Sequence, residues 1–455
     1  MSGLLLRDAG FGGRKRVDVR VAGGAIAEVG DGLARRPGER VLECGGGALI
    51  PGLRDDHLHL HALAAWSRSV PCGPPSVTGR DGLATALRGA APDEHGWVRG
   101  VGYAESVAGD LDAAALDALR ADRPVRVQHR SGALWVLNSA AVRESGLDPG
   151  DHPGIERDAA GAPTGRLWRA DDLLRTRLPP PPPLDLGPIG RELARLGVTS
   201  VTDATPDLTA AAIGSIEDAV RDGSLPQHVR LLGVPLDGRT SCPRVTAGPY
   251  KIVLADSGLP SLDDLTRRIG LAHGHGRPVA VHCVTREALL LLLAAFETTG
   301  VRDGDRVEHA ALVPDESIPE LARRGLRVVT QPGFLADRGD DYLRDVPAAD
   351  LPDLYRCRSL IEAGVPVALS SDAPYGPLDP WAVMDAAVRR TARSGAVVGR
   401  GEAVTAGAAL RSYLTPPGEA ADLVLLHVPL DEALGRLSAG DVRATIAGGR
   451  LVHGR

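Results

Sequence analysis

The sequence predicts an α/β fold whose central part is a barrel of eight parallel strands, each followed by a helix. Three observations support this prediction. Apolar, strand-like runs alternate with helical stretches over the second half of the chain, short strands with glycine turns stand at both ends, and unusual polar residues follow several central strands. Alternation of this kind indicates a parallel sheet, and eight units indicate a closed TIM-type (β/α)8 barrel.

The first barrel strand begins at residue 53, where Pro51 and Gly52 interrupt the apolar run before it. Seven further runs rich in β-branched and apolar residues read as strands. Helical stretches separate most of them. The expected strands are 198–203, 229–234, 250–256, 279–283, 306–309, 326–330 and 365–371, and the expected helices are 213–222, 262–274, 286–298, 317–324 and 359–363.

The two ends of the chain carry short strands separated by glycine pairs, and neither end has enough of them to bury a core alone. We therefore expect residues 1–52 and 404–455 to form one composite β-sandwich. The barrel would comprise 53–75 and 191–403, with an inserted α/β subdomain at 76–190. In that insert Asn138 is expected to cap a helix, and the prolines of 179–183 are expected to form an extended connection.

Composition excludes several classes of function. The 455 residues carry a net charge of −6, without the basic footprint of a nucleic-acid-binding protein. No apolar run approaches the ~20 residues of a membrane span, and the N-terminus lacks a signal-peptide pattern, so we expect a cytoplasmic protein without membrane partners. The five cysteines form no Cys-x-x-Cys pair and are expected to be buried thiols.

Six polar residues at strand ends predict a metal site. His57 and His59 share one face of an extended segment, with Cβ atoms roughly 6–7 Å apart, which allows both rings to reach one ion. In a barrel of parallel strands the C-terminal strand ends meet at one face. Nitrogen and carboxylate donors without paired cysteines favour Zn²⁺ or a similar divalent ion. The six are His57, His59, Lys251, His282, His309 and Asp372.

Lys251 is unusual because lysine occurs only here and at Lys15, whereas arginine supplies the other basic side chains. It lies in an apolar segment where a charged amine is costly. A desolvated lysine can lose its proton and arginine cannot. The alternative is a structural lysine whose amine pairs with Asp256 or Asp203.

This donor set suits hydrolysis. A metal-bound water would supply a hydroxide nucleophile near neutral pH, and the metal would polarise the carbonyl under attack. Asp372 is the candidate base and acid, taking the proton of the water and delivering it to the leaving nitrogen.

The motifs at these strand ends resemble those of the amidohydrolase superfamily over nearly the whole chain. Further motifs resemble the amidohydrolase-3 branch, which includes N-substituted formamide deformylases. The strand-end motifs are residues 51–59, 281–282, 306–310 and 370–374, and the branch motifs are 130–132 with 138–139, 154–157 with 163–165, 330–332 and 372–381.

The resemblance implies a binuclear centre. His57, His59 and Asp372 would hold one ion, His282 and His309 a second, and Lys251, carboxylated on its amine, would bridge them. If Lys251 is structural, a mononuclear site of His57, His59, His282 and Asp372 remains. The sequence departs from the branch at Ala133, where a histidine is usual, at residues 256–257, and in a shortened segment at 414–422.

The leading interpretation is hydrolysis of a carbon–nitrogen bond in a small amide, formamide or cyclic amide. Two alternatives remain: a mononuclear aminohydrolase that deaminates a heterocycle, and a non-catalytic binding protein that keeps the barrel. A homodimer is expected from the resemblance alone. The candidate substrate contacts are Tyr103, Arg130, Trp135 and Tyr375.

Overall fold

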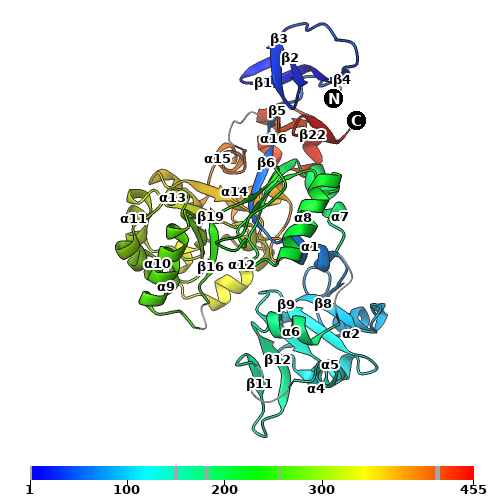
Figure 1. The fold of residues 1–455 in the computed structure, drawn as a ribbon, viewed down its shortest axis with the longest axis vertical. Coiled ribbons are helices and arrows are strands. Elements are labelled where there is room, and N and C mark those ends of the chain that lie inside the picture. The colour runs from blue at the N-terminus through cyan, green and yellow to red at the C-terminus, as the bar shows by residue number, and fades with distance from the viewer. Residues whose placement is uncertain (1–2, 148–151, 180–183, 256–257, 416–420, 455) are drawn as a thin grey trace. The chain divides into compact units, whose positions relative to one another are not determined.

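The computed structural model describes residues 3–147, 152–179, 184–255, 258–415 and 421–454. Contacts divide the chain into two compact units (Figure 1). Unit 1 comprises Met1–Leu60 and Leu186–Arg455, and unit 2 comprises His61–Asp185. Unit 2 begins earlier than the predicted insert, and the separate barrel and sandwich boundaries within unit 1 stay predictions.

Parallel strands form the centre of unit 1, as the alternation of elements predicted. They lie in a four-stranded sheet and a five-stranded sheet. The fourth predicted strand has a short strand before it, which pairs with the third. In spatial order the first sheet is β15 (Val245–Ala247), β14 (His228–Leu231), β13 (Val198–Asp203) and β6 (Leu53–Leu58), and the second is β16 (Tyr250–Val253), β17 (Val279–Cys283), β18 (Arg306–His309), β19 (Arg327–Thr330) and β20 (Val367–Leu369).

Main-chain hydrogen bonds connect the two sheets at both margins. The Lys251 amide donates to the Leu232 carbonyl over 3.1 Å, and the Asp372 amide donates to the His57 carbonyl over 2.8 Å. Each bond is made by the backbone of a predicted metal ligand. The strand ends that carry these ligands are therefore held together by the backbone.

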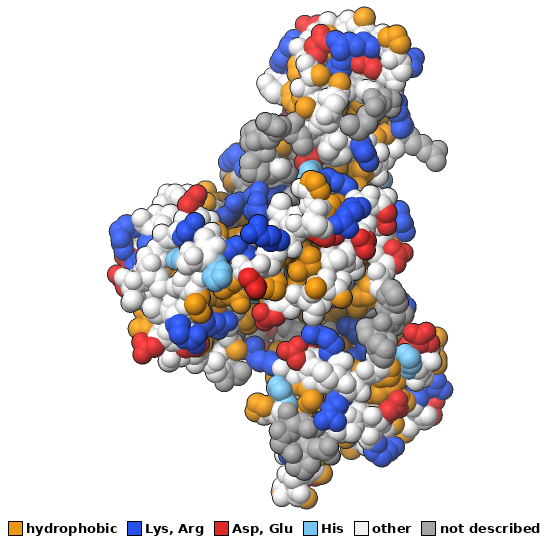
Figure 2. Space-filling model, in the orientation of Figure 1, with side chains coloured by type: hydrophobic (Ala, Val, Ile, Leu, Met, Phe, Trp, Pro, Cys, Tyr) orange, Lys and Arg blue, Asp and Glu red, His pale blue; other side chains and the backbone are white. Residues whose placement is uncertain are grey.

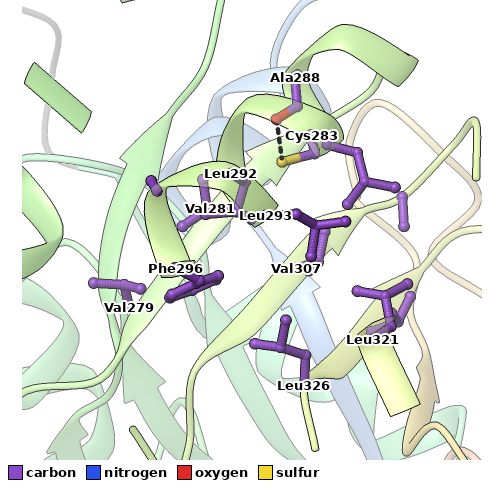
Figure 3. Close-up of a cluster of buried hydrophobic side chains, with 14 of the residues drawn as sticks. Val279, Val281, Cys283, Ala288, Leu292, Leu293, Phe296, Val307, Leu321 and Leu326 are labelled. Carbon is purple, nitrogen blue, oxygen red and sulfur yellow. Dashed lines mark hydrogen bonds between the residues drawn. The ribbon is translucent and has the colours of Figure 1, made fainter. Parts of the chain in front are cut away.

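Helices follow the strands and cover their apolar side. Thr285 caps the longest of them by accepting a hydrogen bond from the Ala288 amide, and Phe296 of this helix packs with Val281 and Val307 in a buried cluster (Figure 3). The predicted helices correspond to α8 (Ala210–Asp222), α9 (Leu262–Gly274), α10 (Arg286–Thr299), α11 (Ile318–Arg323) and α13 (Cys357–Glu362).

The helix α12 (Gly333–Asp345) of this region was not predicted, and neither was α14 (Pro380–Arg389). In α12 the reason is its glycines. Its buried residues include Gly333 and Gly339 beside Phe334 and Leu335. Glycine has poor helix propensity and leaves gaps in an apolar pattern, so the helical period was hidden.

Strands from both ends of the chain share one apolar core. One sheet has the order β3-β2-β1-β4, and the other has the order β23-β22-β21-β5. Leu6 and Val19 from the N-terminal part pack in one cluster with Leu423 and Ile446 from the C-terminal part. The bounds are β1 (Leu4–Phe11), β2 (Arg14–Ala22), β3 (Ala25–Gly30), β4 (Arg40–Glu43), β5 (Leu49–Pro51), β21 (Leu423–Leu426), β22 (Val442–Ala447) and β23 (Arg450–His453).

The last strand of the N-terminal part leads directly into the first strand of the parallel sheets. β5 pairs with β21, and Gly52, which separates β5 from β6, donates its amide hydrogen bond to the Asp422 carbonyl. A Cβ atom at Gly52 would stand 2.1 Å from Thr199 Oγ1. Only glycine allows the chain to pass this close to β13.

Unit 2 is a separate α/β body with a six-stranded sheet of order β11-β12-β10-β9-β8-β7. The side chain of Asn138 accepts a hydrogen bond from the Ala141 amide, which confirms the predicted cap of α5 (Ser139–Ser145). Prolines 180–183 lie outside the described residues. The strands are β7 (Val70–Pro71), β8 (Val98–Tyr103), β9 (Val125–His129), β10 (Leu134–Leu137), β11 (Ile155–Arg157) and β12 (Pro163–Trp168).

All five cysteines are free and buried, as predicted. Burial raises the pKa of the Cys72 and Cys357 thiols to about 12, so these thiols stay protonated at neutral pH. Within the described part of the chain, no helix has both the length and the apolar character needed to cross a membrane.

Candidate metal centre

The structure brings the predicted histidines together at the C-terminal ends of the parallel strands. His57 is the penultimate residue of β6 and His59 follows the strand, while His282 and His309 lie on β17 and β18. The ring centroids of His57 and His59 are 5.5 Å apart, those of His57 and His309 4.7 Å, and those of His282 and His309 4.3 Å. Four imidazoles thus form one continuous group.

His57, His59 and Asp372 form the tightest part of this group, with their ligand atoms all within 4.8 Å of one another. Asp372 Oδ1 lies 3.5 Å from His57 Nε2 and 3.2 Å from His59 Nε2. Two atoms that each bind one ion tetrahedrally at about 2.1 Å are roughly 3.4 Å apart. The spacing of these three donors therefore fits a single divalent ion.

Two atoms of this group lack hydrogen-bond partners although they are buried. They are His57 Nε2 and Asp372 Oδ1, and no described residue satisfies either atom. A buried polar atom left unpaired costs free energy comparable to a lost hydrogen bond. A metal ion between them would satisfy both, so the residues present fit a bound divalent metal.

The second ring nitrogen of each of three histidines is held by a neighbour. His57 Nδ1 contacts the buried carboxylate of Glu308, His59 Nδ1 lies 3.1 Å from Thr205 Oγ1, and His309 Nδ1 lies 2.9 Å from Gln331 Oε1. Because Gln331 Oε1 and the Glu308 carboxylate can only accept, the Nδ1 atoms of His309 and His57 carry the proton. Their Nε2 atoms are then free to bind a metal.

Glu308 and His309 are adjacent in β18, yet both reach His57. In a regular strand adjacent side chains point to opposite faces. His309 has a φ of +67° and Ala310 a φ of +45°, and the Ala310 amide donates to the Glu308 carbonyl over 2.9 Å. This tight turn redirects the His309 ring to the side that Glu308 faces.

The protonation states suit metal binding. Burial lowers the pKa of His57 and of His309 well below the ordinary histidine value, and nearby positive charges, Lys251 among them, lower it further. Both rings are therefore neutral at pH 7, the form that binds a metal.

Lys251 lies on β16 and is 5% exposed. Burial lowers the pKa of its amine, while the carboxylates of Glu308 and Asp372 act in the opposite direction. Of the alternative partners, Asp256 lies outside the described residues. Asp203 instead accepts hydrogen bonds from the Leu60 and Thr205 amides.

Sequence reasoning assigned no role to Glu308, Gln331, Thr205 or Asp55. Glu308 and Gln331 lie inside the motifs at residues 306–310 and 330–332, but their contacts with His57 and His309 were not predicted. Asp55 Oδ1 accepts hydrogen bonds from the His57 and Ser371 amides, which joins β6 to the segment before Asp372. Burial raises the pKa of Asp55 to about 7.

Of the four predicted substrate contacts, Tyr375 lies at the centre, with its ring 5.6 Å from that of His59. Arg130, Tyr103 and Trp135 belong to unit 2. The Tyr103 hydroxyl donates to the Gly109 carbonyl over 2.5 Å, and Trp135 Nε1 donates to Asp171 Oδ1 over 2.9 Å. Both rings are buried in the apolar clusters of that unit, and their substrate role stays a prediction.

Comparison with known proteins identifies the class. The model of the amidohydrolase family designated Amidohydro_3 matches residues 40–453, and this chain belongs to that family. The family match makes the protein an amidohydrolase, and the group of His57, His59 and Asp372 is one that could hold a metal ion.

Three similar proteins illustrate the relationship. The N-substituted formamide deformylase of Arthrobacter pascens is 26% identical over 530 aligned positions, covering 96% of this chain and 95% of the relative. The putative amidohydrolase YtcJ of Bacillus subtilis (strain 168) is 26% identical, covering 78% of this chain and 75% of its own. A crystal structure of an uncharacterized metal-dependent hydrolase from Pyrococcus horikoshii OT3 superposes with a TM-score of 0.70 at 24% identity, over 90% of this chain and 92% of that one.

Proposed function

We propose that this protein hydrolyses the carbon–nitrogen bond of a small amide, formamide or cyclic amide. The observation that carries the proposal is the trio of His57, His59 and Asp372, in which a buried imidazole nitrogen and a buried carboxylate oxygen face each other without other partners. The similarity to a formamide deformylase over nearly the whole of both chains supports the choice of bond.

The residues of the site divide the work. A bound divalent metal would supply Lewis acidity toward the carbonyl oxygen and would lower the pKa of a water molecule. Asp372 has its second oxygen, Oδ2, 3.9 Å from His309 Nδ1. We propose that Asp372 accepts a proton from the attacking water and then donates it to the leaving nitrogen. Water and amide thereby give a carboxylic acid and an amine.

Beside this trio we propose a second metal position, formed by His282 and His309. A carboxylated Lys251 would serve both metal positions. The neighbouring rings of the two histidines and the lowered pKa of the buried amine support this arrangement. We also infer that the two parallel sheets close into one barrel, because hydrogen bonds join them at both margins. Residues 1–52 and 404–455 would form the composite sandwich, and residues 76–190 the insert.

The test combines metal content with substrate screening. Protein purified without chelators should contain divalent metal, with zinc the expected ion, and should release formate or another acid from a panel of N-substituted formamides and N-acyl amines. The His59→Asn variant should lose metal and activity together. Ammonia release from a heterocycle with one metal per chain would favour the aminohydrolase alternative, and a protein that binds no metal would contradict the proposal.

A further inference from the structure

A cluster of arginines lies on the same parallel strands, near the N-terminal ends of three of them. Arg54 is on β6 and Arg230 on β14, while Arg306 and Arg327 begin β18 and β19. We call these four residues the arginine cluster. They come from both sheets, and Figure 2 shows basic side chains gathered on this face over the barrel strands.

One carboxylate stands at the middle of the arginine cluster. Asp56 Oδ2 lies 3.0 Å from Arg54 Nη2 and 3.4 Å from Arg327 Nη2, and Asp56 Oδ1 lies 3.9 Å from Arg306 Nη1. Thr202 Oγ1 donates to Asp56 Oδ1, and Thr202 pairs in register with Arg230 on the next strand.

The positive charges outnumber the negative charges that face them. The second acidic partner, Glu308, is ion-paired with Arg306 but also contacts His57 in the metal centre. Four guanidinium groups thus share two carboxylates, one of which also serves another site. Uncompensated charge in a partly buried place is unfavourable, so a further anion would be stabilised there.

Two observations show unused donors in the arginine cluster. The Nε atoms of Arg54 and Arg327 are buried and have no hydrogen-bond partner in the described part of the chain. Arg230 is exposed and, among described residues, has neither a hydrogen bond nor an ion pair. Its stem lies against Gly248, where a Cβ atom would stand 2.6 Å from Arg230 Cγ, so the glycine leaves room for it.

The electrostatics agree with the geometry. For Arg230 and Arg327 alike, burial lowers the pKa of the guanidinium, the Asp56 carboxylate raises it, and the neighbouring arginines lower it further. The four charges are therefore close enough to repel one another.

We propose that the arginine cluster is a binding site for one phosphate-sized oxyanion, separate from the metal centre. Guanidinium groups present planar pairs of N–H donors that match the oxygens of a phosphate group. Arg230 and Arg327 are the more exposed members and would contact the anion first. Asp56 holds the side chains of Arg54 and Arg327 in place through its ion pairs with them. The occupant would be inorganic phosphate or a metabolite carrying a phosphate group.

Thermal unfolding of the metal-loaded protein in inorganic phosphate tests the proposal. Phosphate should raise the Tm saturably relative to chloride at the same ionic strength, and equilibrium dialysis should find about one phosphate per chain. Arg230→Gln combined with Arg327→Gln should raise the half-saturating phosphate concentration at least tenfold. Metabolites with and without a phosphate group then identify the source of the anion.

The control removes two exposed arginines elsewhere, Arg358→Gln combined with Arg389→Gln, whose phosphate response should equal that of the unmodified protein. If the double variant of the cluster folds poorly, Arg230→Gln alone serves, because Arg230 has no pairing to lose and should still weaken phosphate binding severalfold. Absence of a phosphate-specific shift would overturn the proposal. An undiminished shift in the cluster variants would overturn it as well, because phosphate would then act elsewhere, for instance at the metal centre.

Discussion

The Glu308→Gln substitution is the sharpest test of how the metal centre is positioned. Glu308 is fully buried, and its carboxylate contacts His57 Nδ1 on one side and Arg306 on the other. A glutamine of nearly the same shape can keep its oxygen toward Arg306 only by turning its NH₂ group toward His57. Two N–H groups would then oppose each other, and His57 would have to move its proton to Nε2, the atom that faces Asp372.

The magnitude follows from comparable partners of metal-binding histidines, whose loss typically weakens metal affinity 10- to 100-fold. This factor equals about 1.4 to 2.7 kcal/mol of binding free energy. Unfolding should also become easier, by about 3 kcal/mol, because Arg306 loses a buried negative partner. Arg306 keeps its contacts with Asp56, since its Nη2 donates to the Asp56 carbonyl over 3.0 Å and its Nη1 lies 3.9 Å from Asp56 Oδ1. We therefore expect the low end of the range for broken buried pairs.

Competition with a chromophoric zinc chelator measures the affinity, and urea unfolding measures the stability on the same samples. The matched control is Glu320→Gln, which removes an equal charge from a partly exposed carboxylate paired with Arg323 and Arg324. The control should bind zinc as tightly as the unmodified protein. An affinity of Glu308→Gln within threefold of that value, in a folded sample, would refute the assignment of the His57 proton.

Three further outcomes are expected. Lys251→Ala should lower the metal content, measured by elemental analysis, from about two ions per chain to about one, and an unchanged content would argue against a bridging lysine. Phe296→Ala should lower the free energy of unfolding in urea by about 3–5 kcal/mol, because this ring is 1% exposed, and a loss below 1 kcal/mol would show that the cluster repacks. In unit 2, the hydrogen bond from His129 lowers the pKa of Glu105 to about 2, below the ordinary value of about 4.3. The stability it adds is therefore complete above pH ~4.3 and is lost as the pH falls through 2. Since the Glu105 side chain is 50% exposed, Glu105→Gln should cost less than about 1 kcal/mol at pH 6. Acid titrations of both proteins should converge near pH 2, and a gap that persists there would contradict the pairing.

The parallel strands and the convergence of the candidate metal donors could be predicted because each strand has a recognisable local sequence pattern. An apolar run ends in a polar residue, as at Val281-His282 or Val307-Glu308-His309, and the strand ends meet wherever parallel strands lie side by side. Family membership was predictable for the same reason. These signals need no knowledge of distant contacts.

The partners of those donors could not be predicted, because they depend on backbone geometry and on long-range contacts. Strand alternation assigns Glu308 and His309 to opposite faces, and only the φ of +67° at His309 brings both toward His57. Thr205 meets His59 across 146 positions of sequence. The aromatic residues of unit 2 show the same limit, since Trp135 donates to Asp171 in a buried setting that its sequence neighbours do not reveal.

The continuity of β5 and β6 also bears on the order of assembly during translation. β5 pairs with β21, about 370 residues later in the sequence, and the Gly52 amide donates to the Asp422 carbonyl immediately before the strand that carries His57. Residues up to Asp422 must therefore leave the ribosome before these contacts can hold the start of the first histidine strand. Until then, the nascent chain would lack the main-chain bonds that join β5 and Gly52 to the C-terminal sheet.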